Sequence, residues 1–227
     1  MTNLELVAFC EQAAEKKTLY MWGTYGRKIT ESLISNKQKQ YSSRYSEKRV
    51  QFLKNHIDGE TLGCDCAGLI KWALWTNGDI SKSPQYFAET DRGTNGLYRE
   101  AKEKGGILSL PELAGVVVYK DGHVGVYVGN GKVVECTLGS RGDGVVFSAL
   151  KKGGWTHWLK LPEVEYLEPV KPEEIMPPEM PKPPKEEPKP ETEKKPVSPQ
   201  KTMSKTQQKI SLLKKLKKIL LKHQRRF

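Results

Sequence analysis

The clearest pattern of hydrophobic and polar positions lies between residues 114 and 137, where apolar side chains recur with a period of two. The segment AGVVVYKDGHVGVYVGNGKVVECT contains three apolar runs, which are separated by Lys-Asp-Gly and by Gly-Asn-Gly. Alternation of this kind is typical of strands that bury one face, and both separators favour tight turns. The pattern predicts an antiparallel meander in this part of the chain.

Helical spacing dominates earlier in the chain, in two segments. Residues 3 to 17 place apolar side chains at helical intervals, and Asn3 is expected to cap that helix. Residues 66 to 76 form a second apolar run with the same spacing, in which Trp72 and Trp75 are expected to lie in the core. Helices that are followed by strands predict an α+β fold.

The composition of the chain changes twice, and these changes predict three zones. Residues 1–167 carry all five tryptophans and all nine tyrosines, so we expect them to form the folded domain. Residues 168–200 repeat Pro among Glu and Lys and offer little to bury, which predicts a disordered, extended linker. Residues 201–227 contain no acidic residue and form a separate cationic zone.

The cationic zone has the pattern of a basic amphipathic helix, with leucines in one arc and lysines on the other side. Its central residues are Lys214, Lys215, Leu216, Lys217, Lys218 and Ile219. We expect this helix to bind an anionic membrane or an anionic wall polymer. Docking on its own domain, or on a partner helix, is the alternative. The dense lysine face, which has no interspersed acid, favours the anionic surface.

Net charge and hydropathy limit the partners and the location. A net charge of +11 points toward nucleic acid, anionic lipid or cell-wall polymers. The basic tail lacks a set of stacking aromatic residues, so nucleic acid is not an expected partner. The first residues lack the pattern of a Sec-type signal peptide, and no stretch reaches the roughly 18 apolar residues of a spanning helix. We expect synthesis in the cytoplasm and export by another route.

Four cysteines, at positions 10, 64, 66 and 136, are the first candidates for chemistry. Cys64 and Cys66 are too close to bridge each other comfortably, and they lack the second cysteine pair of a zinc site. Cys66 directly precedes the apolar helical run, where free N–H groups and the helix dipole are expected to stabilise a thiolate. Asp65 can cap the same helix. Cysteine usage alone favours the alternative, a small buried residue.

A nucleophilic cysteine requires a base, and histidine is the expected one. His223 lies in the tail, His56 lies in a charged segment, and His157 is expected to be structural. His123 opens the segment HVGVYVG beside a turn, where its ring can project over the end of a neighbouring helix. Glu135 lies twelve residues later on the next expected strand, and it is the candidate for the group that orients the imidazole.

The register of these two strands decides whether Glu135 can reach His123. A simple two-residue hairpin loop would place Glu135 opposite Val126 on the apolar face, where burying a carboxylate is costly. A shift of one residue, through a three-residue loop or a glycine bulge, pairs Val126 with Val134 instead. The shifted register brings His123 and Glu135 to one face and assigns Cys136 to the core.

Three segments together resemble the NlpC/P60 family of cysteine peptidases. GCDCAGLIKW resembles the family's nucleophile motif, and GHVGVYVGNGKVVE resembles its histidine strand and the strand after it. LYMWGTYG, residues 19 to 26, resembles its upstream tyrosine segment, and the similarity runs from about residue 4 to residue 160. The resemblance implies a papain-like fold without cofactors. It also implies cleavage of bacterial peptidoglycan peptides, often after γ-D-glutamate.

The resemblance also implies a role for each matched residue. Cys66 corresponds to the nucleophile and His123 to the base. The third position is usually His, Asn or Gln in the family; here it is Glu135, and a carboxylate can still orient the ring. Tyr20 corresponds to the tyrosine beside the nucleophile, although by residue type alone it could equally be a half-buried core aromatic. Asp65 corresponds to a residue that shapes the site or contacts substrate.

We therefore expect a peptidoglycan endopeptidase that is joined by its linker to a cationic anchor and acts at the bacterial cell wall after release or delivery. A bacteriophage lysin fits this description, and so does a bacterial toxin that is exported by a secretion machine. Two alternatives stay open. One is an N-acetylmuramoyl-L-alanine amidase with the same cysteine and histidine. The other is a non-catalytic cationic protein that binds walls or membranes.

Overall fold

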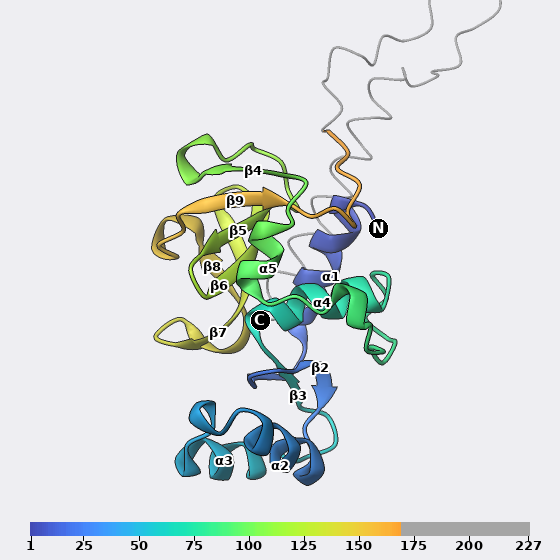
Figure 1. The fold of residues 1–227 in the computed structure, drawn as a ribbon, viewed down its shortest axis with the longest axis vertical. Helices are drawn as coiled ribbons and strands as arrows, with labels where there is room; N and C mark the ends of the chain where they lie inside the picture. Colours follow the sequence, from blue (N-terminus) through green and yellow to red (C-terminus); the bar gives the residue numbers. More distant parts are fainter. Residues whose placement is uncertain (169–227) are drawn as a thin grey trace, which may run out of the picture. The chain divides into compact units, whose positions relative to one another are not determined.

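The computed structural model describes residues 1–168, which form an α+β domain with two sheets (Figure 1). The predicted fold class is confirmed. The predicted linker, from residue 169 on, and the cationic helix at 201–227 lie outside the described residues. The boundaries of the three zones therefore stay predictions. None of the helices within residues 1–168 is long and apolar enough to cross a membrane.

The larger sheet is antiparallel, has six strands and contains the predicted meander. Its order is β4 (Glu103–Gly106), β9 (His157–Lys160), β5 (Val117–Lys120), β6 (His123–Gly129), β7 (Lys132–Gly139) and β8 (Gly142–Ala149). One face of the sheet is covered by helices, and the other carries a smaller apolar cluster that includes Tyr127 and Trp155. The sheet is thus buried on both faces around its central strands.

The hairpin between β6 and β7 has the shifted register that burial requires. Val126 pairs with Val134, and Gly129 pairs with Lys132, with a register shift between Tyr127 and Gly129. The turn itself is Asn130-Gly131, and both residues have positive φ, as a tight hairpin turn of this type requires. The bulge precedes the turn, so the predicted pairing of valines is confirmed.

Two helices form the main core against the large sheet (Figure 1). They are α1 (Asn3–Glu15) and α4 (Cys66–Trp75), and the start of α4 confirms the predicted helix. The expectation that Asn3 caps α1 is wrong. Thr2 is the cap, because its hydroxyl accepts a hydrogen bond from the backbone of Glu5 while the Glu5 carboxylate accepts one from Thr2. Asn3 is instead buried, and its side chain bonds Ala114 and Leu167.

A second lobe, which the sequence pattern did not predict, lies between β2 and β3 in the chain. Its elements are α2 (Glu31–Gln40), a short 3-10 turn (Ser42–Arg44) and α3 (Glu47–Lys54). A small sheet joins it to the main core: β3 (Leu62–Cys64) runs parallel to β1 (Thr18–Tyr20) and antiparallel to β2 (Tyr25–Lys28). The lobe has its own apolar cluster of Met21, Ile29, Ile34, Tyr45 and Leu53.

One further α-helix, α5 (Thr94–Arg99), lies between α4 and the large sheet in the chain. It follows a long segment after α4 that contains a 3-10 turn at Ala88–Thr90. The described termini of the domain are tied together, since Glu165 donates and accepts backbone hydrogen bonds with Met1 and Asn3.

Candidate active site

The nucleophile motif lies at the junction between the small sheet and the main core. β3 ends at Cys64, α4 begins at Cys66, and Asp65 is the single residue between them. The Asp65 carboxylate accepts one hydrogen bond from the Gly68 N–H at 2.6 Å and one from the Gly23 N–H at 2.7 Å. The predicted capping role of Asp65 is confirmed. The same carboxylate fastens the loop after β1 to the start of the helix.

Asp65 is buried, and its carboxylate has protein partners on both oxygens. Burial raises the pKa of Asp65, while Lys71 and the two backbone N–H donors act in the opposite direction. Gly68 is required at its position, because a Cβ there would lie 1.9 Å from the carbonyl oxygen of Thr24. These contacts place Asp65 as a residue that shapes the site. A direct contact with substrate stays a prediction.

Cys66 lies against the segment that begins β6. Its Sγ is 3.9 Å from the carbonyl oxygen of Gly122, the residue before His123. Burial, and next the Asp65 carboxylate, raise the pKa of Cys66 to about 12, although backbone N–H groups of Val124 and Ala67 act in the opposite direction. The backbone N–H groups thus favour a thiolate, as expected, but burial has the larger effect. Desolvation of the sulfur outweighs the helix terminus, so the thiol needs a base.

His123 and Glu135 lie together, as the strand register predicts. The His123 Nε2 is 2.6 Å from a carboxylate oxygen of Glu135, which is fully buried. Because Glu135 occupies Nε2, Nδ1 is the nitrogen left for a proton from a neighbouring group. The imidazole thus has one nitrogen held by the protein and one available for chemistry.

Arg141 holds the other side of the Glu135 carboxylate. Its Nε donates to one carboxylate oxygen at 2.8 Å, and its Nη2 donates to the other at 3.0 Å. Burial raises the pKa of Glu135, but the hydrogen bonds to His123 and Arg141 outweigh it and bring the pKa to about 2. The carboxylate is therefore ionised at neutral pH.

Trp155 packs on the imidazole of His123 as a second support. The two rings are nearly parallel, with an interplanar angle of 9° and centroids 5.4 Å apart. His157, by contrast, packs against Tyr98 with ring centroids 5.0 Å apart. This contact agrees with its expected structural role. Glu135 thus holds the edge of the His123 ring by a hydrogen bond, and Trp155 packs against its face.

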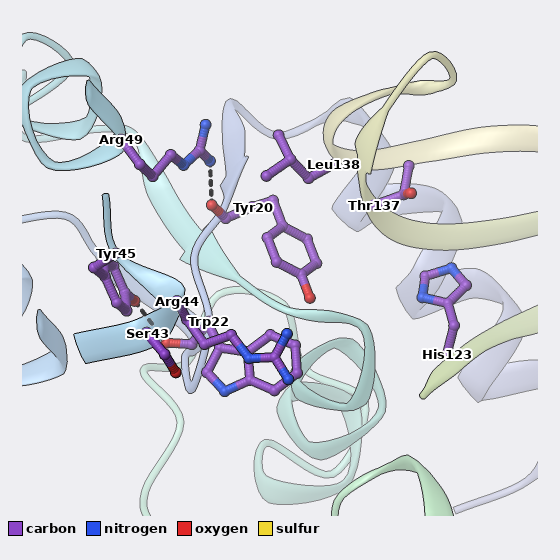
Figure 2. A pocket seen from close by; sticks show the side chains of 9 residues that line it. All are labelled: Tyr20, Trp22, Ser43, Arg44, Tyr45, Arg49, His123, Thr137 and Leu138. Carbon is purple, nitrogen blue, oxygen red and sulfur yellow. Dashed lines mark hydrogen bonds between the residues drawn. The ribbon is translucent and has the colours of Figure 1, made fainter. Parts of the chain in front are cut away.

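Tyr20 lines a cavity of about 410 Å³ beside His123 (Figure 2). Burial, and next the neighbouring Cys66, raise the pKa of Tyr20. The strand that carries it is fixed by Asp143, which accepts from the Tyr20 N–H at 2.8 Å and pairs with Arg49 at 2.5 Å. The structure therefore brings Tyr20 to the nucleophile, as its position in the motif predicts.

A second hollow, of about 300 Å³, is also lined by Trp22 and contains Cys66 in its wall. Trp22 lines both hollows, so they adjoin along one indole ring. One hollow is lined by His123 and the other by Cys66, so both candidate catalytic residues face open space.

Sequence reasoning missed Arg141, Trp155 and the Arg49–Asp143 pair. A buried carboxylate needs hydrogen-bond donors or a cationic partner, and Arg141 is the first arginine after Glu135, so that contact had a detectable signal. The stacking of Trp155 on His123 had no signal in the sequence. Trp155 lies in the segment before β9, which begins two residues later at His157, so strand periodicity does not place its ring. Within residues 1–168, no cluster of three or more histidine, cysteine or acidic side chains is arranged to hold a metal ion.

The sequence model of the NlpC/P60 family matches residues 20–163, which is more than half of the chain. The chain belongs to the NlpC/P60 family. The matched range contains the five residues that the sequence predicts for the active site: Tyr20, Asp65, Cys66, His123 and Glu135. No curated protein matches the chain.

Solved structures of NlpC/P60 proteins are similar to this chain, at low identity. The peptidoglycan hydrolase RipB from Mycobacterium tuberculosis is 21% identical, with a TM-score of 0.40, over 72% of this chain and 67% of its own. The P60 domain of antigen MAP1204 from M. avium subspecies paratuberculosis is 19% identical, with a TM-score of 0.41, over 72% and 98%. NlpC2 from Trichomonas vaginalis is 13% identical, with a TM-score of 0.40, over 70% and 46%. This chain thus spans less than half of the NlpC2 structure.

Proposed function

We propose that this NlpC/P60 protein is a cysteine peptidase that hydrolyses peptide bonds in the stem peptides of bacterial peptidoglycan, after γ-D-glutamate. The observation that carries the proposal is the arrangement of Cys66 beside the strand of His123, whose ring is held by the buried carboxylate of Glu135. A thiol, an imidazole and an orienting group in this order are the parts of a cysteine nucleophile and its base.

The first step is the attack of the Cys66 sulfur on the carbonyl carbon of the peptide bond. Its proton moves to the free nitrogen of His123 as the carbon–sulfur bond forms, which offsets the burial that raises the pKa of Cys66. The Glu135 carboxylate stabilises the resulting imidazolium, since it stays ionised with a pKa of about 2.

The tetrahedral oxyanion that forms lies beside the start of α4. The N–H groups of Cys66 and Ala67, at the start of this helix, have no partner within it and are available to stabilise the oxyanion, whereas the Gly68 N–H is already bonded to Asp65. The imidazolium of His123 then protonates the leaving amine, and the carbon–nitrogen bond breaks. Water then attacks the remaining thioester and gives a proton to His123. The carbon–sulfur bond breaks, the peptide acid leaves, and His123 returns the proton to the Cys66 sulfur.

We also propose that the protein acts at the cell wall after release or delivery, with residues 201–227 as an anchor for anionic lipid or wall polymers. The support is compositional, because this segment combines regularly spaced leucines with many lysines and has no acidic residue. The attraction is electrostatic in part, so it should weaken as the ionic strength rises.

The test of the proposed reaction is the release of new amino groups from purified peptidoglycan. Wild-type protein is compared with Cys66→Ala and with Cys10→Ala, which removes a buried thiol outside the site. The proposal predicts release by the wild type and by Cys10→Ala, and none by Cys66→Ala. Equal release by the Cys66 variant would refute a cysteine mechanism.

A further inference from the structure

Arg44 presents a cation to the cavity that contains His123 and Tyr20. It ends the 3-10 turn at Ser42–Arg44 in the lobe between β2 and β3, and it is exposed. Its guanidinium lies over the indole of Trp22, with the guanidinium carbon 4.2 Å from the ring centroid. Figure 2 shows this stacked pair beside the Tyr20 ring at the edge of the cavity. Stacking holds the guanidinium plane without using its N–H donors.

The side chains that line this cavity carry a net positive charge. Among the nine residues that line it are two arginines, Arg44 and Arg49, and no aspartate or glutamate. Arg49 is already engaged, since it pairs with Asp143 and donates to the Tyr20 carbonyl. Within residues 1–168, no carboxylate lies at ion-pair distance from Arg44 or from Arg27, which does not line this cavity, whereas Arg49, Arg92, Arg99 and Arg141 each have at least one.

We propose that Arg44, stacked on Trp22, forms a subsite that binds a free carboxylate of the substrate in the cavity beside His123. The inference deepens the proposed function and rests on it. In a stem peptide that is cut after γ-D-glutamate, the α-carboxylate belongs to the same residue as the reacting carbonyl. That carboxylate is therefore the anionic group that lies close to the reacting carbonyl when the peptide is bound.

A carboxylate fits this subsite better than a neutral group for two reasons. The guanidinium offers paired N–H donors in a fixed plane, which match the two oxygens of a carboxylate. The contact with Trp22 holds the guanidinium at the cavity before the substrate arrives, so less side-chain freedom is lost on binding. The hydroxyl of Ser43, which lines the same cavity, can add a donor.

Binding to the Cys66→Ala protein tests the subsite separately from catalysis. The probes are three synthetic L-Ala-γ-D-Glu-L-Lys-D-Ala peptides: the free acid, the peptide with only the D-glutamate α-carboxylate amidated, and the peptide with only the C-terminus amidated. Their dissociation constants are measured by calorimetry at low salt. Arg44→Gln and Arg44→Lys are added to the Cys66→Ala background. Lys48→Gln is the matched control, because it removes an exposed cation of the same lobe that does not line the cavity.

The subsite predicts that the free acid binds about tenfold tighter or more than the D-glutamate amide, while the C-terminal amide binds like the acid. Arg44→Gln should abolish this preference, Arg44→Lys should keep part of it, and Lys48→Gln should leave it unchanged. Equal binding of the acid and the D-glutamate amide to Cys66→Ala would overturn the proposal. Persistence of the preference in Arg44→Gln would overturn it as well.

Cleavage assays with the same peptides separate the subsite from the proposed reaction. If cleavage depends on Cys66 but the acid-to-amide ratio of kcat/KM is the same in the wild type and in Arg44→Gln, the peptidase stands and the subsite is wrong. If the acid preference in binding depends on Arg44 but the wild type cleaves none of the peptides, the subsite stands and the proposed reaction is wrong. If Arg44→Gln lowers kcat/KM equally for the acid and the amide, Arg44 only supports the cavity wall and the subsite is wrong.

Discussion

Arg141 and Glu135 form a two-point contact behind the imidazole of His123. Both oxygens of the fully buried carboxylate accept from the guanidinium, and one of them also contacts His123. Arg141 lies in the turn between β7 and β8, on the same hairpin as Glu135. The hairpin thus supplies both the orienting carboxylate and the cation that allows it to be buried.

Removal of Arg141 should therefore affect both stability and activity. Arg141→Met leaves the buried carboxylate with fewer donors, so we expect a loss of about 1 to 3 kcal/mol in the free energy of unfolding. We also expect a lower kcat, because His123 is held less firmly. Urea unfolding at pH 7 measures the first effect. Arg99→Met, which breaks an exposed pair with Glu100, is the control and should cost less than about 0.5 kcal/mol.

The pH dependence of stability should report the ionisation of Glu135. Its pKa in the folded protein is about 2, below the ordinary value of 4.5, so the stabilisation is present above about pH 4.5. It is lost as the pH falls from 4.5 toward 2, and the difference corresponds to about 3 kcal/mol. Glu135→Gln should remove this part of the acid dependence. Unfolding curves for both proteins between pH 2.5 and 7 should converge at low pH; parallel curves would contradict the assignment.

Glu135 and His123 should differ in their effect on catalysis. His123→Ala removes the group that carries the proton, and we expect a loss of at least about 10³-fold in kcat. Glu135→Gln keeps a hydrogen-bond acceptor for the ring but not the charge, and we expect a loss of about 10- to 100-fold. Steady-state rates on the stem peptide measure both. Equal losses would show that the carboxylate takes part in more than orientation.

Trp155 should act through the position of His123 rather than through substrate. Trp155→Phe keeps an aromatic face against the imidazole, and we expect a change in kcat of less than about threefold, whereas Trp155→Ala should lower kcat about tenfold or more. KM should change little in either variant. Circular dichroism checks that both stay folded. A loss in Trp155→Phe as large as that in Trp155→Ala would argue against a stacking role.

The sequence was sufficient for those parts of the site that periodicity and spacing control. The alternation of residues 114–137 predicted the meander, and the cost of burying a carboxylate selected the register that brings Glu135 to His123. The helix at Cys66 followed from its apolar spacing. These are short-range features, in which one local choice determines many neighbours.

The remaining features depend on tertiary contacts that spacing does not encode. The pKa of Cys66 is set by burial among distant elements, which outweighs the local helix terminus. The lobe of α2 and α3 escaped prediction because its helices bury few apolar residues, Ile34 in one and Leu53 in the other. Arg44 reaches the cavity only because this lobe lies beside Trp22.

The cationic zone at 201–227 can be tested without reference to its structure. Deletion of these residues should weaken binding to vesicles that contain anionic lipid, and raised salt should weaken the binding of the full chain in the same way. Cosedimentation with anionic and with neutral vesicles measures this. Cleavage of a soluble stem peptide serves as the control and should not change. Equal binding by the truncated and full chains would contradict the proposed anchor.

Mass spectrometry of the fragments released from purified peptidoglycan, wild type beside Cys66→Ala, tests the central claim most directly. The account predicts wild-type fragments with a new amino terminus at the residue that follows γ-D-glutamate, and none from the variant. New termini at L-alanine, with the glycan separated from the peptide, would identify an amidase instead. Fragments of the same kind from both proteins, or from neither, would contradict the assignment of Cys66 as the nucleophile of a peptidoglycan peptidase.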